Sequence, residues 1–558
     1  MAVDPGFETL ERETADALFE FQPPFAVALG RHEYDGRLPD YSAEGTARWG
    51  ATIDRLRGRL EAIDPEGLSA DRKVDAFLLR LVLEGSSFDL REARLLERNP
   101  MSYLGALSLT AYLCREYAPV PMRVDAIARV LGGVPGMLAQ GRQRLAGPLP
   151  RPFVELALSI GAGLPSHFRD AEAFATQAGL GDRVAPARET AEAALAGFLD
   201  WLREQELVRA TPEFALGPER FQRLLYVREG IEAPFADLEK AGAADLARNR
   251  ARLDQIAHEQ RLPISALISH LQHDHPSADD LIPAAREYVE ECRRFVEEHR
   301  LVSIPGPVAC RVEESPVWAR ATTTASMNGP GPFDAQSTEG IYYVTPVDPA
   351  WTVEQQSEWL RTMNRPMLRN TAVHEAYPGH YLQALHFRAN AGSLTRKIYA
   401  SPSFVEGWAH YTEQLAIEAG LGAGSVAAEV TQLLDALLRD CRLLASIRMH
   451  TAGWTVAEAT ALFEKEALLD RLPAEREAVR GTFDAEYFCY TLGKLAILDV
   501  RRRLLARKFG GDQRAFHDAL LRFGCPPVGL LEGLLEAMPS PTVPGANGTP
   551  STSVASRL

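Results

Sequence analysis

Residues 370–383 read NTAVHEAYPGHYLQ, and this stretch decides which fold the chain is expected to have. It begins like the zinc-binding helix motif H-E-x-x-H, with His374 and Glu375, but position 378 is Pro and the next histidine is His380. Residues four apart on a helix lie about 40° apart around the axis, whereas residues six apart lie about 240° apart. On an undisturbed helix, His374 and His380 therefore could not bind the same ion.

Pro378 and Gly379 stand between the two histidines. Proline lacks an N–H, and in α geometry its ring clashes with the carbonyl four residues earlier. Glycine accepts almost any backbone conformation. The pair predicts a break or a widened turn that swings His380 back toward His374. The alternative is a capped helix in which His380 is only a polar residue near a kink.

A second segment, SPSFVEGWAHYTEQLAIEAG at 401–420, supplies the third candidate ligand. Glu406, His410 and Glu413 are spaced to share one face of a helix. We assign Glu406 as the ligand, because a Glu on a downstream helix completes a two-His zinc site. His410 or Glu413 would orient the ligands, and His410 is also a candidate substrate-binding group. Two alternatives stay open: a solvated polar face, and His410 in place of His380 as the second imidazole.

Two further helical segments carry candidate groups. In FDAEYFCYTLGKLAILDVRRRLLARKF, at 483–509, Tyr490 could donate a hydrogen bond to a developing oxyanion, although most tyrosines on such a helix belong to the core. In DCRLLASIRMHTAGWT, at 440–455, Arg442 and His450 lie eight residues apart on one face. We take Arg442 as a candidate substrate-binding group and His450 as a candidate catalytic group. A buried salt bridge is the competing interpretation.

The composition excludes several classes of protein. The chain has 558 residues, 46% of them hydrophobic, as is usual for a globular protein, and no basic run lies beside aromatics as nucleic-acid binding would require. Acidic residues at positions 4, 8, 11 and 13 occupy the place of a signal peptide's apolar core, and no stretch reaches 18 apolar residues. The six cysteines are scattered and form no C-x-x-C pair, as in a reducing compartment. We expect a cytoplasmic monomer or homodimer that binds neither membrane nor nucleic acid.

The pattern of residues predicts a mainly α protein. Apolar residues at three-four spacing dominate both halves of the chain. Thr, Val and Tyr rise and Gly and Pro cluster only at 307–346, which is the one convincing strand region. The end of the chain is rich in Pro, Gly, Ser and Thr, which predicts disorder. We predict three parts: an N-terminal helical lobe at 1–265, a catalytic lobe with a small sheet and the metal site at 266–540, and a disordered tail at 541–558.

The motifs HEAYPGH at 374–380, FVEGWAHY at 404–411 and YTLGKLAILDVR at 490–501, in this order, resemble the bacterial family designated domain of unknown function 885. The resemblance also takes in GRHEYDGRLPDYS at 30–42 and GIYYVTPVDP at 340–349, and so covers nearly the whole chain except the tail. It implies a fold related to the gluzincin metallopeptidases, in which two helical lobes flank a deep cleft bordered by a small β-sheet.

The resemblance also implies roles for particular residues. His374, His380 and Glu406 would be the metal ligands, Glu375 the general base, and Tyr490 the family's C-terminal tyrosine. We therefore expect a zinc-dependent hydrolase, most simply a peptidase that cleaves short peptides with a metal-activated water. A strand within 317–330 would lie along the cleft and pair with an extended peptide.

Two other functions stay open. The first is a non-catalytic protein that binds metal and a peptide or small ligand. The second is a metal-dependent amidase or esterase that acts on a non-peptide substrate. Glu375 speaks against the non-catalytic alternative, because a structural zinc site needs no free carboxylate beside its ligands.

Overall fold

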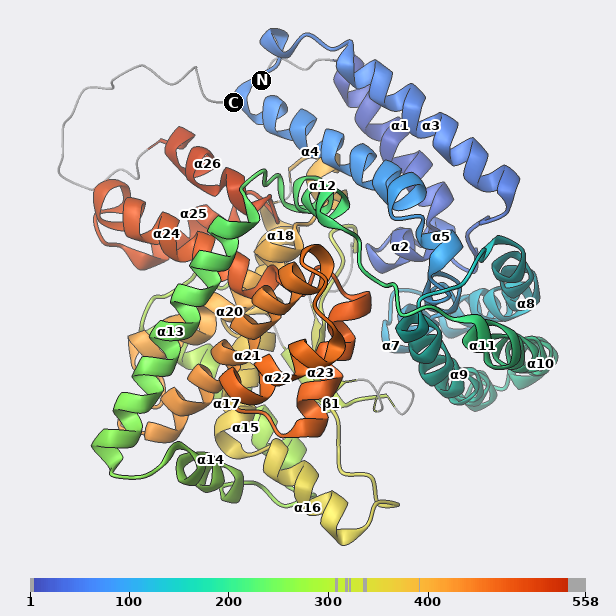
Figure 1. Cartoon of the computed structure of the whole chain (residues 1–558). Coiled ribbons are helices and arrows are strands. Elements are labelled where there is room, and N and C mark those ends of the chain that lie inside the picture. The colour runs from blue at the N-terminus through green and yellow to red at the C-terminus, as the bar shows by residue number, and fades with distance from the viewer. Residues whose placement is uncertain are drawn as a thin grey trace.

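The computed structural model describes residues 5–306, 310–316, 320, 323–334, 339–390 and 392–539. These residues form a mainly helical molecule with a small three-stranded sheet (Figure 1). The predicted mainly α class is confirmed, and so is the strand region at 307–346. The predicted tail at 541–558 lies outside the described residues.

The first eleven α-helices, blue to green in Figure 1, gather on one side of the molecule around two apolar cores, the smaller of which is formed by α1, α3 and α4. Short 3₁₀ and π segments connect several of them. Their bounds are α1 Pro5–Phe21, α2 Pro23–Ala28, α3 Ala43–Glu61, α4 Ala70–Ser87, α5 Leu95–Arg98, α6 Met101–Gly105, α7 Thr110–Cys114, α8 Val120–Arg144, α9 Arg151–Gln177, α10 Ala185–Trp201 and α11 Leu207–Arg209.

The remaining helices occupy the other side of Figure 1, with α12 between the two groups. Their bounds are α12 Pro218–Glu229, α13 Phe235–Gln260, α14 Ile264–His273, α15 Leu281–Glu298, α16 Val353–Thr362, α17 Arg365–Glu375, α18 His380–Asn390, α19 Leu394–Ile398, α20 Pro402–Ala419, α21 Val426–Thr451, α22 Val456–Glu466, α23 Arg471–Phe483, α24 Cys489–Phe509, α25 Gln513–Leu521 and α26 Leu531–Ala537.

Helix α13 lies inside the predicted N-terminal lobe but packs in the C-terminal half. Its Leu253 and Ile256 share an apolar core with Leu437 of α21, and Lys494 of α24 forms a buried ion pair with Asp245 of α13 at 2.5 Å. The core contacts therefore change before residue 265, where the sequence analysis places the boundary. Among the described helices, none is both long and apolar enough to cross a membrane.

The sheet has the strand order β1-β3-β2. Strand β3 (Gly340–Val344) pairs in parallel with β1 (Cys310–Glu314) and antiparallel with β2 (Ala325–Asn328). The outer edge of β1 is partly covered, because Arg286 Nε donates to the carbonyl of Val312 at 3.2 Å. The outer edge of β2 pairs with no strand in the described ranges. One carbonyl on that edge is also covered, because Thr323 Oγ1 donates to the carbonyl of Ala325 at 2.6 Å.

Helices α20 and α24 cross in close contact. A Cβ on Gly407 of α20 would lie 2.4 Å from the Cα of Gly493 on α24, and a Cβ on Gly493 would lie 1.7 Å from the carbonyl oxygen of Ser403. Only glycine allows two backbones to approach this closely. The crossing brings the helix that carries Glu406 beside the helix that carries Tyr490.

Candidate metal centre

The predicted break between the two histidines is present. Helix α17 ends at Glu375, α18 begins at His380, and Gly379 N donates back to the carbonyl of Val373 at 3.0 Å. A Cβ on Gly379 would lie 1.8 Å from the carbonyl oxygen of His374, so this position admits no side chain. Trp408 Nε1 donates to the Pro378 carbonyl at 2.8 Å. Both the local sequence and the packing of α20 therefore hold the break.

The break brings three candidate ligands together. The imidazole rings of His374 and His380 lie 4.7 Å apart at 86° to each other. Their Nε2 atoms lie 3.6 Å and 3.4 Å from Oε2 of Glu406, and one ligand atom from each of the three residues lies within 4.8 Å of the others. Within the ranges that the structure describes, no other group of three His, Cys, Asp or Glu meets this criterion.

These separations fit a zinc ion. Zinc binds nitrogen and oxygen at about 2.0–2.2 Å, so the edges of its coordination tetrahedron are about 3.4 Å long. The distances of 3.4 Å and 3.6 Å are long for hydrogen bonds to a carboxylate but match such an edge. Burial raises the pKa of Glu406, but His380 and His374 hold it well below its usual range, so the carboxyl group is ionised as a ligand must be. Two histidines and one glutamate leave a fourth position for water or substrate.

Glu413 orients His374 from behind. Its Oε1 lies 2.6 Å from Nδ1 of His374, which makes Nδ1 the donor and leaves the lone pair of Nε2 for the ion. Glu413 is fully buried, and burial raises its pKa, but Arg439 and His410 hold that pKa well below its usual range. Arg439 lies 3.1 Å from Glu413 and 3.6 Å from Asp435. A buried charged network thus fixes the first imidazole.

Glu375 is half-buried and makes no hydrogen bond or ion pair to any described residue. It lies near the sheet: burial raises the pKa of the Tyr342 hydroxyl, and the charge of Glu375 raises it further. The carboxylate next to the ligand His374 is therefore available to accept a proton.

Tyr490 lies beside the ligands. Its ring is 6.4 Å from that of His374, at an angle of 23°, and the guanidinium groups of Arg439 and Arg442 lie 5.5 Å and 5.2 Å from its centre. Burial, with a further contribution from Glu406, raises the pKa of its hydroxyl. That hydroxyl is therefore protonated at neutral pH, and it makes no hydrogen bond within the described part of the chain. It is available as a donor.

His450 and Arg442 do not join this group. The N–H of Leu216 donates to Nδ1 of His450 at 3.2 Å, and Nε2 of His450 donates to the carbonyl of Gly481 at 2.8 Å. Burial lowers the pKa of His450 to about 4. Both ring nitrogens are thus bonded to backbone groups, and the structure does not bring His450 to the other candidate residues. Arg442 donates through two nitrogens to Glu477, both at 2.8 Å, which is the salt bridge left open as the alternative.

His410 is fully buried and lies in the layer behind the ligands. Its Nδ1 is 3.2 Å from Oε2 of Glu413, and burial lowers its pKa to about 3. This position fits the orienting role and not contact with a substrate. It is His380, and not His410, that the structure brings to His374 and Glu406.

Sequence reasoning missed several residues that build this centre. Arg439 and Asp435 on α21 carry no motif, and their role depends on packing against α17 and α20. Gly407 and Gly493 stood inside the quoted motifs, and a glycine within a helix is itself a signal of close backbone approach.

A sequence profile described as "Bacterial protein of unknown function (DUF885)" matches residues 23–535. The chain belongs to this family. Two solved structures are similar to this DUF885 protein, and at such low identity they support the fold alone. One is a proposed lipoprotein of unknown function from Shewanella oneidensis, with a TM-score of 0.78 and 24% identity over 95% of this chain and 99% of that one. The other is a proposed lipoprotein from Colwellia psychrerythraea, with a TM-score of 0.77 and 17% identity over 96% and 99%. No curated protein matches the chain.

Proposed function

We propose that the protein is a zinc-dependent hydrolase, and specifically a peptidase that cleaves short peptides. The observation that carries this proposal is the convergence of His374, His380 and Glu406, with the unpaired carboxylate of Glu375 next to the first ligand. A two-His, one-Glu set with an open fourth position is the ligand pattern of zinc hydrolases, whereas structural zinc sites are closed by four protein ligands.

Each residue would have a distinct task. Zinc, when bound, supplies a water of lowered pKa and polarises the scissile carbonyl. Glu375 accepts the proton of that water and passes it to the leaving amine. Tyr490 donates a hydrogen bond to the oxyanion that develops on the substrate. Glu413 holds His374 in the tautomer and orientation that binding requires.

The sheet would bind the substrate. Strand β2 lies within the predicted segment 317–330, contacts both α17 and α18, and has an outer edge that pairs with no strand in the described ranges. An extended peptide can add to such an edge through main-chain hydrogen bonds. The proposal includes a gluzincin-like cleft between two helical lobes, which would admit short peptides and exclude folded proteins. The proposal also includes a cytoplasmic location. The description lipoprotein is given to the two similar structures and is said of those proteins.

The direct test joins metal analysis to a substrate screen. Purified protein is expected to contain about one zinc ion per chain, and elemental mass spectrometry measures this content. Dipeptides to pentapeptides, blocked and unblocked at each end, are then incubated with the protein, and the products are identified by mass spectrometry. Cleavage should stop with a chelator and return when zinc is added.

The same experiment separates the competing functions. If zinc-loaded protein cleaves no peptide but hydrolyses simple amides or esters, the proposed peptide substrate is wrong and the proposed zinc-dependent hydrolysis is supported. If it cleaves nothing yet binds peptide, the protein is a binding protein. If it holds no metal and none can be added, the whole proposal fails.

A further inference from the structure

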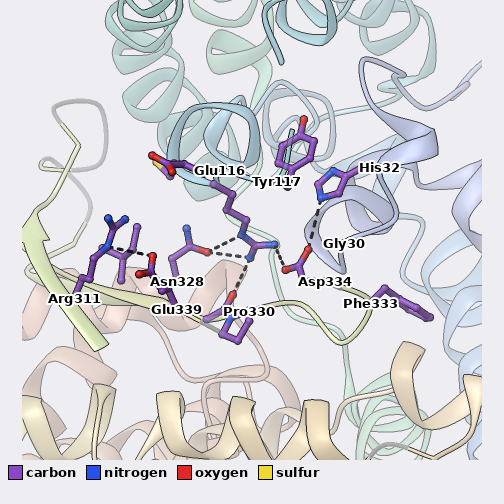
Figure 2. Close-up of a pocket in the computed structure, with 14 residues that line it drawn as sticks. Gly30, His32, Glu116, Tyr117, Arg311, Asn328, Pro330, Phe333, Asp334 and Glu339 are labelled. Carbon is purple, nitrogen blue, oxygen red and sulfur yellow. Dashed lines mark hydrogen bonds and ion pairs between the residues drawn. The ribbon is translucent and has the colours of Figure 1, made fainter. Parts of the chain in front are cut away.

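The motif GRHEYDGRLPDYS at 30–42 takes no part in the proposed chemistry, and its first residues lie at the junction between the N-terminal helices and the sheet. They face the segment 329–334, which follows β2, across a cavity of about 200 Å³ (Figure 2). In Figure 2, Asp334 of that segment points toward His32 of the motif, and its Oδ1 lies 3.6 Å from Nε2 of His32. The chain that leaves β2 is therefore in contact with the N-terminal part of the protein.

The backbones approach each other closely at this junction. Gly30 has a φ of +96°, and a Cβ on it would lie 2.5 Å from Oδ1 of Asp334. A Cβ on Gly331 would lie 2.5 Å from the carbonyl oxygen of Leu29. The N–H of Phe333 donates to that same carbonyl at 3.0 Å. Each side thus uses a glycine to bring main chain against its partner, and only glycine permits this approach.

Phe333 ties the same segment to the N-terminal core. Its ring packs against the larger apolar core of the N-terminal helices and meets the ring of Phe19 edge-on, with 6.0 Å between the centres. The guanidinium group of Arg31 and the ammonium group of Lys397 lie 5.4 Å and 5.1 Å from the centre of the Phe333 ring. The segment after β2 is therefore held by a core to which the sheet itself does not belong.

Arg115 joins the end of β2 to the N-terminal side. Its guanidinium group donates to Oδ1 of Asn328 at 2.9 Å and to the carbonyl of Gly329 at 3.0 Å. The same group donates to the carbonyl of Ala28 at 3.0 Å and lies 3.5 Å from Asp334. A guanidinium group carries five N–H donors in a rigid plane, so it can hold several acceptors in a fixed arrangement. Arg115 thus fixes the last residue of β2.

The position of β2 matters for the candidate metal centre. The strand contacts α17 and α18, the helices that carry His374 and His380. Just after the strand, a Cβ on Gly329 would lie 3.2 Å from Cβ of Ala384 on α18. A strand that binds a peptide through main-chain hydrogen bonds must keep its own backbone in place, because a displacement of about 1 Å weakens those bonds and misplaces the scissile bond.

We propose that Arg115 and residues 28–32 form an N-terminal anchor that positions β2 for a peptide substrate. Arg115 is then a positioning residue of the reaction, which acts through the backbone of β2. The inference rests on the proposed peptidase function and gives the N-terminal helices a task within it. Because the candidate ligands lie outside the anchor, the anchor governs peptide affinity and leaves metal binding unchanged.

Hydrogen–deuterium exchange of the zinc-loaded full chain tests the anchor without turnover. Arg115→Ala should accelerate amide exchange within 325–334 about tenfold, since charge-assisted hydrogen bonds are lost, and Asn328→Ala should accelerate it in the same segment. Exchange in α17 and α20 should stay at the wild-type rate. The double variant R115A/N328A should exchange no faster than R115A, because the two side chains belong to one contact.

Peptide affinity is measured on the same variant. Arg115→Ala should raise KM for a short peptide about tenfold, with kcat and zinc content close to wild type, whereas a general loss of structure would lower both. Zinc-loaded Glu375→Gln protein, with and without Arg115→Ala, is also titrated with intact peptide by calorimetry, and the affinity should differ by about tenfold.

The matched control is Arg48→Ala. Arg48 belongs to the same N-terminal helices but is exposed and pairs with Asp40 at 2.6 Å. Its removal should leave exchange within 325–334 and peptide affinity at their wild-type values.

The outcomes separate the anchor from the hydrolase. Unchanged exchange within 325–334 in Arg115→Ala, or equal acceleration in α17 and α20, would overturn the anchor. Cleavage by wild type with unchanged KM in Arg115→Ala would overturn it too and leave the hydrolase intact. No cleavage by wild type, together with weaker peptide binding after Arg115→Ala, would support the anchor while the hydrolase proposal fails. Protein that binds no peptide would overturn both.

Discussion

Two sets of candidate polar residues differ in how the structure bonds them: the set His374, His380 and Glu406, predicted from a broken helix and a downstream Glu, and the pair Arg442 and His450, predicted from helical spacing. His374, His380 and Glu406 direct ligand atoms at one another from distances of 3.4–3.6 Å to the carboxylate. Arg442 instead donates through Nε and Nη2 to Glu477, and both ring nitrogens of His450 bond to backbone groups. Helical spacing can place side chains on one face of a helix. A binding site also requires that their donor and acceptor atoms point toward one another and are not already bonded to other groups.

The largest expected difference between the two sets is in metal content. His380→Ala should lose most of the zinc, because two ligands hold the ion far less tightly than three. His450→Gln should keep it, since His450 does not face the ion. Metal mass spectrometry of both purified variants measures this. Full retention of zinc in His380→Ala would remove His380 from the ligand set and return His410 as the second imidazole.

The next effect is on turnover without loss of metal. Glu375→Gln keeps the shape of the side chain but removes the base, so kcat should fall by roughly 10²–10⁴-fold. Zinc content should stay at the wild-type level, and its measurement is the control. A Glu375→Gln protein that turns over at the wild-type rate would show that another group accepts the proton.

Tyr490 is expected to contribute somewhat less. Tyr490→Phe removes a hydroxyl that lies beside the ligands and bonds to no described residue, and kcat should fall by about 10²–10³-fold. KM and zinc content should change little, because the ring and its contacts with Arg439 and Arg442 remain. A rise in KM at unchanged kcat would instead assign Tyr490 to substrate binding.

A smaller effect is expected from the layer behind the ligands. Glu413→Gln should weaken zinc affinity by about 10- to 100-fold, since the carboxylate that fixes His374 is lost. Competition with a chelator of known affinity measures this. Glu418→Gln on the same helix is the matched control, because Glu418 pairs with Arg501 near the surface and should leave affinity unchanged. Equal affinities in the two variants would contradict the orienting role.

The smallest effect concerns His450 and appears only with pH. Its folded-state pKa of about 4 lies below the usual value of 6.5. Between these values the unfolded chain binds more protons, so the free energy of unfolding falls as pH falls. His450→Gln removes this contribution, and the stability gap between wild type and variant should shrink by about 1–3 kcal/mol from about pH 7 to about pH 4.5. Urea unfolding at the two pH values measures it, and a constant gap would show that His450 titrates normally.

The sequence predicted what depends on neighbours along the chain. The break at Pro378 and Gly379 follows from the conformational limits of two residue types, and the helix carrying Glu406 from its apolar spacing. The sequence did not predict contacts between residues that are far apart along the chain. The nitrogens of His450 are occupied by Leu216 and Gly481, and Arg439 reaches Glu413 only because α21 packs beside α20. No local pattern encodes those contacts, because they follow from how helices stack after they form.

The crossing of Gly407 and Gly493 has a consequence for how far this centre can vary. Both positions already carry the smallest residue, so the contact between α20 and α24 can change in one direction only, toward a wider separation. Any side chain added at either position moves the two helices apart, and Tyr490 moves away from Glu406 with them. The distance between the Tyr490 hydroxyl and Glu406 therefore depends on glycine at both Gly407 and Gly493, which are 86 positions apart along the chain.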